Sequence, residues 1–401
     1  MMRHCLGVVL VLLGLVSFGE QASARKAGPE FKINATQAYF NLYSSIAVLK
    51  DGTFVVGWMN VYYGDADFFQ EAYGRRFGAD GTPMANEVRF GIHDDNYQGK
   101  PVLAALDDGG FAAVWSYWDP GAGLYGQRYN AAGKRIGPEF QVVGPDEFNL
   151  SAYSVAGLGN GGFVVVWSIS NGSGRSAYGQ RYDSAGQRSG STFTIATGLS
   201  GAVRVAALGI GSFVVVWVAT DGSRSGVYSQ RYNAVGTAVG GKFRVNSFTT
   251  DEQSTPSVAA LARGGFAVVW ASRGQDGSRY GIYGQRYSTQ GTPVGGEFQI
   301  NTYTNNDQLA PHVSGLKDGG FVVAWTSVDQ EGTDSEVYGQ RYSAAGARAS
   351  GEFRINSFAN GRQREPSVAS LGNGFVVAWT SYKPHAIAPW DGLYGQRFLP
   401  E

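Results

Sequence analysis

One pattern constrains the fold of this chain more than any other: a unit recurs along almost its whole length. The first marker is Tyr-Gly-Gln-Arg-Tyr or a variant, which begins at Tyr73, Tyr125, Tyr178, Tyr228, Tyr283, Tyr338 and Tyr394. The second is a Phe-to-Trp pentamer, which ends at Trp58, Trp115, Trp167, Trp217, Trp270, Trp325 and Trp379. The third is an extended segment centred on Phe31, Val88, Phe140, Phe193, Phe243, Phe298 and Phe353. Three markers in seven copies, with no spare sequence between them, indicate a repeat architecture.

Each repeat contains four short strand candidates. In the fifth copy these are Ser257–Leu261, Phe266–Trp270, Tyr283–Tyr287 and Glu297–Asn301. Asp-Gly or Asn-Gly separates the first two strands in most copies, and these dipeptides adopt the positive φ angles of a tight hairpin. No segment has helical periodicity. The 59 glycines among 401 residues suit such a turn-rich chain. We therefore expect an all-β protein.

The second strand of each repeat is apolar on both faces, as in Phe111–Trp115, so we expect sheets with neighbours on each side. Four-stranded sheets packed around an axis satisfy this requirement, which predicts a seven-bladed β-propeller of four-stranded blades. After its leader, the chain begins with a lone strand of the fourth type, Phe31–Asn34, and it ends just after a strand of the third type, Tyr394–Phe398. We expect the N-terminal strand to complete the last blade and close the ring. This order is similar to WD-repeat propellers, although the Trp-Asp dipeptide is absent.

The repeat also resembles tandem units of about 53 residues in large secreted bacterial proteins, often found beside hemolysin-type calcium repeats. The matching motifs here are Val258–Leu261, Gly264–Trp270, Tyr283–Tyr287 and Glu297–Asn301. The resemblance covers nearly all of residues 30–399 and implies an extracellular context. It implies no activity, and the glycine-rich calcium nonapeptide is absent from this chain.

The N-terminus is typical of a secretory signal peptide. Arg3 precedes an apolar run, Cys5–Phe18, and Ala22–Ala24 has the small residues that signal peptidase accepts. We expect a signal peptide at 1–24 and a single domain at 25–401, secreted or periplasmic, from a bacterium. No second run is long enough to cross a membrane.

Zero formal net charge argues against nucleic acid as a partner. We expect a monomer.

A repeated arginine of the third strand is interpreted as structural. It recurs at Arg76, Arg128, Arg181, Arg231, Arg286, Arg341 and Arg397. A buried guanidinium needs acceptors. The glutamate before the fourth-strand phenylalanine is one candidate, at Glu30, Glu139, Glu297 and Glu352. Backbone carbonyls are the other, because Lys242 takes the glutamate's place in one copy.

Function should lie where the copies differ, in the loops on one face. The loops after the second strand are polar in copies 3 to 6 but aromatic in copies 7, 1 and 2, which are consecutive in a closed ring. The residues that we expect to bind ligand there are Tyr62, Tyr63, Phe68, Trp118, Asp119, Trp390 and Asp391. The neighbouring loops add Tyr39, Phe40, Tyr43, His93, Asp94, Asp95, Tyr97, Tyr382 and His385. Aromatic rings beside short carboxylates favour a site for a glycan or a protein ligand. Packing of longer loops over the closing blade is the alternative.

Signals for metal binding and catalysis are weaker. Asp329, Glu331 and Asp334 have the alternate spacing of oxygen ligands for calcium, and a solvated acidic loop is the alternative. No other cofactor is expected. Motifs for zinc proteases, P-loops and serine hydrolases are absent, and so is the Ser-x-Asp-x-Gly-x-Thr-Trp box of sialidases. The sequence thus favours a binding module over an enzyme. An extracellular hydrolase of the glycosidase or lyase type, using loop carboxylates, stays as the second interpretation.

Overall fold

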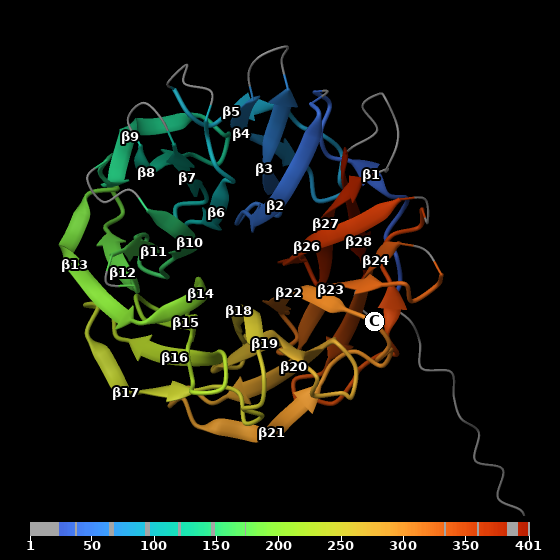
Figure 1. Ribbon diagram of the computed structural model, residues 1–401. Coiled ribbons are helices and arrows are strands. Elements are labelled where there is room, and N and C mark those ends of the chain that lie inside the picture. Colours follow the sequence, from blue (N-terminus) through green and yellow to red (C-terminus); the bar gives the residue numbers. More distant parts are fainter. Residues whose placement is uncertain are drawn as a thin grey trace, which may run out of the picture.

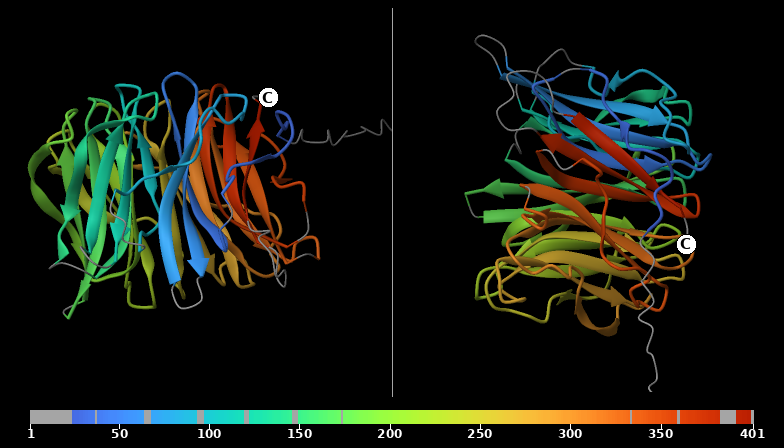
Figure 2. Two further views of the ribbon diagram at one scale, coloured as in Figure 1. Left: turned by 90° about the horizontal axis from the view of Figure 1, so that it is seen from above. Right: turned by 90° about the vertical axis from the view of Figure 1, so that its right-hand side faces the viewer.

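The computed structural model describes residues 24–36, 38–63, 68–92, 97–118, 122–145, 149–172, 174–332, 334–358, 361–382 and 392–399. Strands are the only extended regular elements in these ranges, which confirms the all-β prediction. The sheets are arranged around a central axis (Figure 1), and the strands run roughly along that axis (Figure 2). The described ranges contain no helix that is long and apolar enough to cross a membrane. The chain is a β-propeller.

Five sheets have four strands each, in chain order. Repeat 1 forms β2 Phe40–Val48, β3 Phe54–Tyr63, β4 Phe68–Phe77 and β5 Val88–Arg89. Repeat 2 forms β6 Val102–Ala105, β7 Phe111–Tyr117, β8 Gly123–Tyr129 and β9 Arg135–Val143. Repeat 3 forms β10 Leu150–Gly157, β11 Phe163–Asn171, β12 Gly174–Tyr182 and β13 Arg188–Thr197. Repeat 4 forms β14 Leu199–Ala207, β15 Phe213–Ala219, β16 Gly226–Tyr232 and β17 Ala238–Arg244. Repeat 5 forms β18 Gln253–Ala260, β19 Phe266–Arg273, β20 Tyr280–Tyr287 and β21 Pro293–Gln299.

The remaining strands form one eight-stranded sheet. Repeat 6 contributes β22 Gln308–Gly315, β23 Phe321–Val328, β24 Ser335–Tyr342 and β25 Phe353–Arg354. Repeat 7 contributes β26 Arg362–Leu371, β27 Gly374–Tyr382 and β28 Gly392–Phe398, and β1 Phe31–Lys32 pairs with β28.

The prediction of seven four-stranded blades is therefore wrong. The propeller has five separate four-stranded blades, and repeats 6 and 7 share the larger sheet, joined by a parallel bridge between Ser335 and Arg362. Comparable parallel bridges, such as that between Ser225 and Glu252, lie outside the named strands elsewhere in the ring. Here β26 already begins at Arg362, whose Nε lies 2.6 Å from Asp334 Oδ2, so the bridge falls inside two strands and merges their sheets.

The N-terminal strand closes the ring as expected. Phe31 and Lys32 of β1 pair antiparallel with Gly395 and Tyr394 of β28. The Phe31 ring then packs across the seam against the aromatic pair of repeat 1, with its centroid 6.2 Å from that of Phe54 and 5.6 Å from that of Phe77. Chain ends that are distant in sequence thus share one sheet.

The same aromatic contact holds successive repeats together. Phe140, in the fourth strand of repeat 2, lies 5.0 Å from Tyr182 and 5.8 Å from Phe163 of repeat 3, measured between ring centroids. The glycine of the third-strand motif makes room for this ring, because a Cβ on Gly126 would lie 2.5 Å from Phe140 Cζ. The seven repeat tryptophans are buried, which gives them a structural role in the core.

Six of the seven repeated arginines, all except Arg181, use carboxylates of the hairpin turn or backbone carbonyls as acceptors. Arg341 Nη2 lies 2.7 Å from Asp318 Oδ2 in its own repeat, whereas Arg286 Nη1 donates to the carbonyl of Ala344 in the next repeat. The proposed glutamates do something else. Glu297 accepts from the Ser247 amide at 2.6 Å, so it fixes the end of the preceding repeat. Glu30 and Glu352 likewise accept from the amides of Ser357 and Thr302, so glutamate as the arginine's partner was the wrong alternative at these three positions.

Candidate functional site: the loop face and the mouth of the channel

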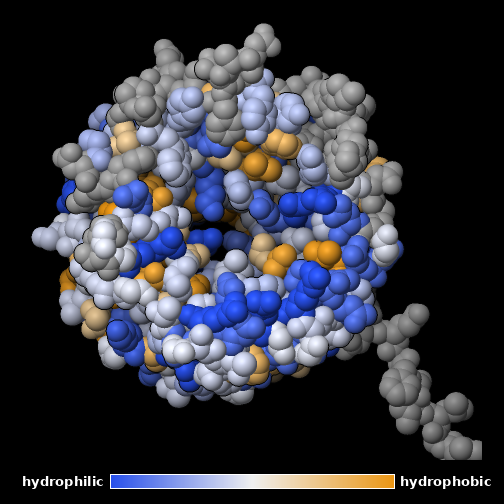
Figure 3. Space-filling view, viewed as in Figure 1, coloured by the Kyte–Doolittle hydropathy of each residue, from blue (hydrophilic) through white to orange (hydrophobic). Residues whose placement is uncertain are grey.

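The first strand of each repeat lines the centre of the ring, and consecutive first strands contact one another. They are β2, β6, β10, β14, β18, β22 and β26 (Figure 1). The space-filling view is hollowed at this centre (Figure 3). We call this hollow the channel. In each repeat a loop connects the second strand to the third. We call the face of the ring that carries these loops the loop face, and the channel opens on it.

Several first strands carry a bulge near the loop face. Their pairing register shifts between Leu42 and Ser45 in β2, and between Arg364 and Ser367 in β26, with like shifts in β18 and β22. The bulge residues have positive φ, at Tyr43, Thr255, Ala310 and Glu365. Side chains other than glycine rarely adopt this conformation. Bulges re-aim side chains and are frequent beside functional sites, so this layer of the channel is a candidate site.

Below the bulges, one residue in each first strand occupies an equivalent position, which we call the belt position. It is Ser45, Val102, Ser154, Arg204, Ser257, His312 or Ser367, each paired with the residue before the repeat tryptophan. Ser154 Oγ accepts from the Val205 amide of the next repeat, and Ser257 Oγ accepts from Val313 at 3.2 Å. His312 Nδ1 accepts from Val368 in the same way, also at 3.2 Å. The belt thereby satisfies edge-strand amides that face the channel.

Four charged side chains meet in this layer. Lys100, which precedes β6, occupies the place of the bulge residue, and Arg204 occupies the belt position of β14. Glu365 is the bulge residue of β26, and Arg364 precedes it. The Lys100 ammonium also lies 5.2 Å from the centroid of the Tyr43 ring, a cation–π contact. These residues come from strands on different sides of the channel.

The directions of the pKa shifts agree with charged groups that lie in one poorly solvated layer. Burial, and then the Arg204 charge, lower the pKa of Lys100 to about 8, while Glu365 acts in the opposite direction. Burial and Arg204 likewise lower the pKa of His312 to about 4. Burial raises the pKa of Glu365, against the effect of Lys100 and Arg364. Arg204 lies in a first strand that lines the channel, and its charge acts on both Lys100 and His312.

Exposed aromatic side chains surround the loop-face end of β2 and β3. Tyr39 is 60% exposed and Tyr63 is 55% exposed, and their rings meet edge to face with centroids 4.7 Å apart. Phe40 packs beside Tyr63 and lies 5.5 Å from Tyr382 of β27, so the cluster joins repeats 1 and 7. We call Tyr39, Phe40, Tyr63 and Tyr382 the aromatic rim.

The structure places only some of the predicted ligand residues on this surface. Tyr63 belongs to the rim. Trp118 is 48% exposed. Its backbone amide donates a hydrogen bond to the carbonyl of Tyr97, which places the two segments side by side. Tyr62 is half-buried instead: its ring stacks on Phe69, and its hydroxyl accepts from Asn60. For Phe68 the structure gives only the backbone pairing with Tyr63. Asp119, Trp390 and Asp391 lie outside the described residues, as do His93, Asp94, Asp95 and His385.

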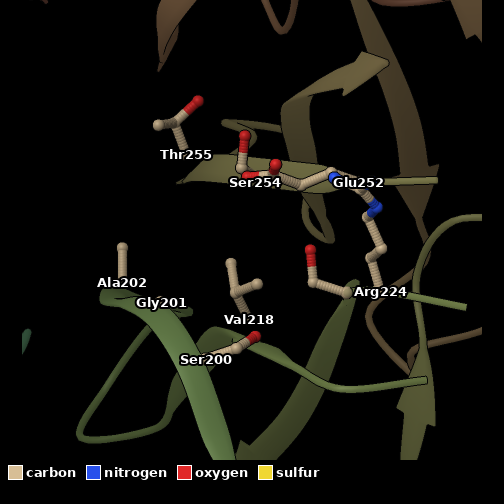
Figure 4. Close-up of a pocket in the computed structure, with 9 residues that line it drawn as sticks. Ser200, Gly201, Ala202, Val218, Arg224, Glu252, Ser254 and Thr255 are labelled. Carbon is tan, nitrogen blue, oxygen red and sulfur yellow. The ribbon is translucent and has the colours of Figure 1, made fainter. Parts of the chain in front are cut away.

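A pocket that the sequence did not indicate lies between repeats 4 and 5. Its volume is about 310 Å³, and it is lined by Ser200, Gly201, Ala202, Val218, Arg224, Ser225, Glu252, Ser254 and Thr255. In Figure 4 the residues of β14 and of β18 face each other across it, with Arg224 and Glu252 to one side. Arg224 is paired with Asp251 at 3.2 Å, and Glu252 accepts from the Tyr280 hydroxyl at 2.8 Å. Most of the lining residues belong to β14, β15 and β18, so the pocket forms where two repeats meet and the loop sequences alone do not indicate it.

The predicted calcium ligands point to different partners. Glu331 pairs with Arg354 at 2.6 Å and accepts from the Tyr338 hydroxyl, while Asp334 pairs with Arg362. Within the ranges that the structure describes, no group of three acidic, histidine or cysteine side chains could hold a metal ion. Calcium binding at Asp329, Glu331 and Asp334 stays a prediction, and any ion there would compete with two arginines.

Comparisons with known proteins support the fold. No family model matches the chain, and no curated protein matches it either. A protein of unknown function from Dyadobacter fermentans is similar in structure, with 14% identity over 94% of this chain and 99% of that one and a TM-score of 0.56. A mutant α-L-arabinofuranosidase from Fusarium graminearum, in complex with an iminosugar inhibitor, has 12% identity over 94% and 98% of the two chains and a TM-score of 0.50. At these identities the likeness concerns the fold.

Proposed function

We propose that this protein binds carbohydrate on its loop face, in the sector formed by repeats 7, 1 and 2. The observation that carries the proposal is the exposed edge-to-face pair of Tyr39 and Tyr63, which continues to Phe40 and Tyr382. Large exposed aromatic surfaces mark interaction sites. Ring faces pack on the apolar faces of sugars, and polar groups nearby fix the orientation. Glu365 and Lys100, from strands of the same sector, supply such groups.

The shared fold agrees with this proposal. The α-L-arabinofuranosidase of similar fold was solved with an iminosugar, a sugar-like molecule. A protein ligand is the other class that an aromatic surface would suit. We place carbohydrate first because the channel mouth beside the rim offers buried polar groups, which a small polar ligand can reach and a flat protein surface cannot. We place the protein outside the cytoplasm, secreted or periplasmic.

The proposal is tested by applying the exported protein and three variants to a glycan array. Tyr63→Ala and Trp118→Ala should weaken binding about two- to tenfold, because a lost aromatic contact is worth about 0.5–1.5 kcal/mol. Val235→Ala is the control, since Val235 is 72% exposed in a turn at the opposite face. Equal binding by all four proteins would exclude the rim as the surface that binds the glycan. Binding to a protein in pull-down with no glycan bound would favour the other ligand class.

A second candidate, a glycoside hydrolase, is favoured by Glu365. Its carboxyl has a raised pKa because of burial, and its Oε2 is buried without a hydrogen-bond partner at the channel mouth. A buried carboxyl whose pKa is raised is suited to act as general acid. If the bound glycan is cleaved, Glu365→Gln should abolish turnover and retain binding. Asp119→Asn and Asp391→Asn test the loop carboxylates in the same assay.

A further inference from the structure

The belt position of repeat 4 is occupied by Arg204, whose side chain cannot accept a hydrogen bond from an amide of the next repeat. Four of the other belt residues are serines, and His312 provides an acceptor as well. A guanidinium has only donors, so Arg204 cannot accept from Val258, the next amide in the pattern. Arg204 Nη1 instead donates to the carbonyl of its own neighbour, Val203, at 3.0 Å. Repeat 4 thus places a cation at a position where repeats 1, 3, 5 and 6 form a structural hydrogen bond.

Arg204 is one of three cations in this layer. Lys100, Arg204 and Arg364 form no ion pair with a carboxylate among the described residues, and Glu365 is the single acid whose charge acts on them. His312 stays neutral above a pKa of about 4. With three cations and one acid, the layer has an excess of positive charge at neutral pH. Cations held in a poorly solvated space without counter-ions favour an anionic ligand.

We propose that Arg204, together with Lys100, binds the carboxylate of an acidic saccharide at the mouth of the channel. This inference rests on the proposed function and defines its ligand class. Arginine suits the role because its planar guanidinium donates two parallel hydrogen bonds to a carboxylate. The sugar ring next to that carboxylate would lie at the channel mouth, within the loop face that also carries the rim. Arg204 is only partly buried, so part of this residue can contact a ligand in the channel.

The chain itself supplies the matched variant. Arg204→Ser installs the residue found at Ser45, Ser154, Ser257 and Ser367, so the fold should be retained and the belt hydrogen bond to Val258 can form. Arg279→Ser is the control, because Arg279 is an exposed arginine of a loop, paired with Asp307 at 3.4 Å. It removes the same formal charge away from the channel. Thermal unfolding of both variants checks that they are folded.

Calorimetric titration uses a panel of oligosaccharides ending in uronic or sialic acid, and the same compounds with the carboxyl reduced to the alcohol. We expect the wild type to bind at least one acid about tenfold or more tightly than its reduced form. Arg204→Ser should abolish that preference, and Arg279→Ser should retain it. Equal affinity for acid and reduced form, or a preference that survives in Arg204→Ser, would overturn the acidic ligand and leave carbohydrate binding standing. If no saccharide of either kind binds, both proposals fail.

Discussion

At the scale of single residues, the belt uses one side chain per repeat for stability, and we propose that Arg204 serves recognition instead. A first strand is an edge strand, and its amides that face the channel need acceptors. Serine supplies an acceptor at small size, and His312 supplies one through Nδ1, which must therefore lack a proton. Protonation would break that hydrogen bond and place a second cation near Arg204. The chemistry of this one histidine thus links stability to pH.

We predict that His312 makes the protein less stable in acid. Its pKa falls from 6.5 to about 4 on folding, because of burial and the Arg204 charge. As pH decreases from 6.5, the unfolded chain takes up the proton first, so the free energy of unfolding falls until about pH 4. Urea unfolding at several pH values should show a flatter profile over this window for His312→Ser, which keeps an acceptor. His312→Leu, without an acceptor, should be less stable at every pH. An identical slope in wild type and His312→Ser would contradict the assignment.

At the scale of elements, the strand β1 closes the ring although it is only two residues long. It supplies the outer strand beside β28 and the phenylalanine that packs on repeat 1. The sequence predicted this strand because its pattern matches the fourth strand of the other repeats. The merging of repeats 6 and 7 into one sheet was not predictable in the same way. It depends on β26 beginning at Arg362, a local contact with Asp334 that no repeat marker includes.

We predict that Phe31→Ala weakens the closure of the ring. Loss of a large buried aromatic ring costs roughly 3–5 kcal/mol, and about 2–4 kcal/mol is expected here because Phe31 is only half-buried. Lys32→Ala is the matched control: it alters the neighbouring exposed residue of the same strand and should change the melting temperature little. Deletion of residues 25–36 should destabilise further, because it leaves β28 with an unpaired edge. Unchanged melting after this deletion would mean that the strand does not close the ring.

At the scale of the whole molecule, the ring brings together residues that the sequence keeps far apart. The aromatic sector could be predicted in part, because loops that differ from their copies stand out in a repeat protein. Tyr63 and Trp118 are exposed there as predicted, whereas Tyr62 is packed on Phe69. Lys100, Arg204 and Glu365 could not, since Lys100 precedes a first strand and the other two lie within first strands, away from the variable loops. Only closure of the ring makes them neighbours. The pocket between β14 and β18 likewise depends on two repeats meeting.

A protein that binds saccharides outside the cytoplasm must be exported, and this gives the last prediction. The apolar run Cys5–Phe18 and the small residues Ala22–Ala24 predict cleavage after Ala24. Expressed from the complete sequence in a bacterial host, the protein should appear in the periplasm or medium, and mass spectrometry should find Arg25 at its N-terminus. Ala24→Leu, which removes a small residue at the cleavage site, should slow processing and leave the precursor on the membrane. An uncleaved wild-type chain in the cytoplasm would refute export, and with it the extracellular saccharides as ligands.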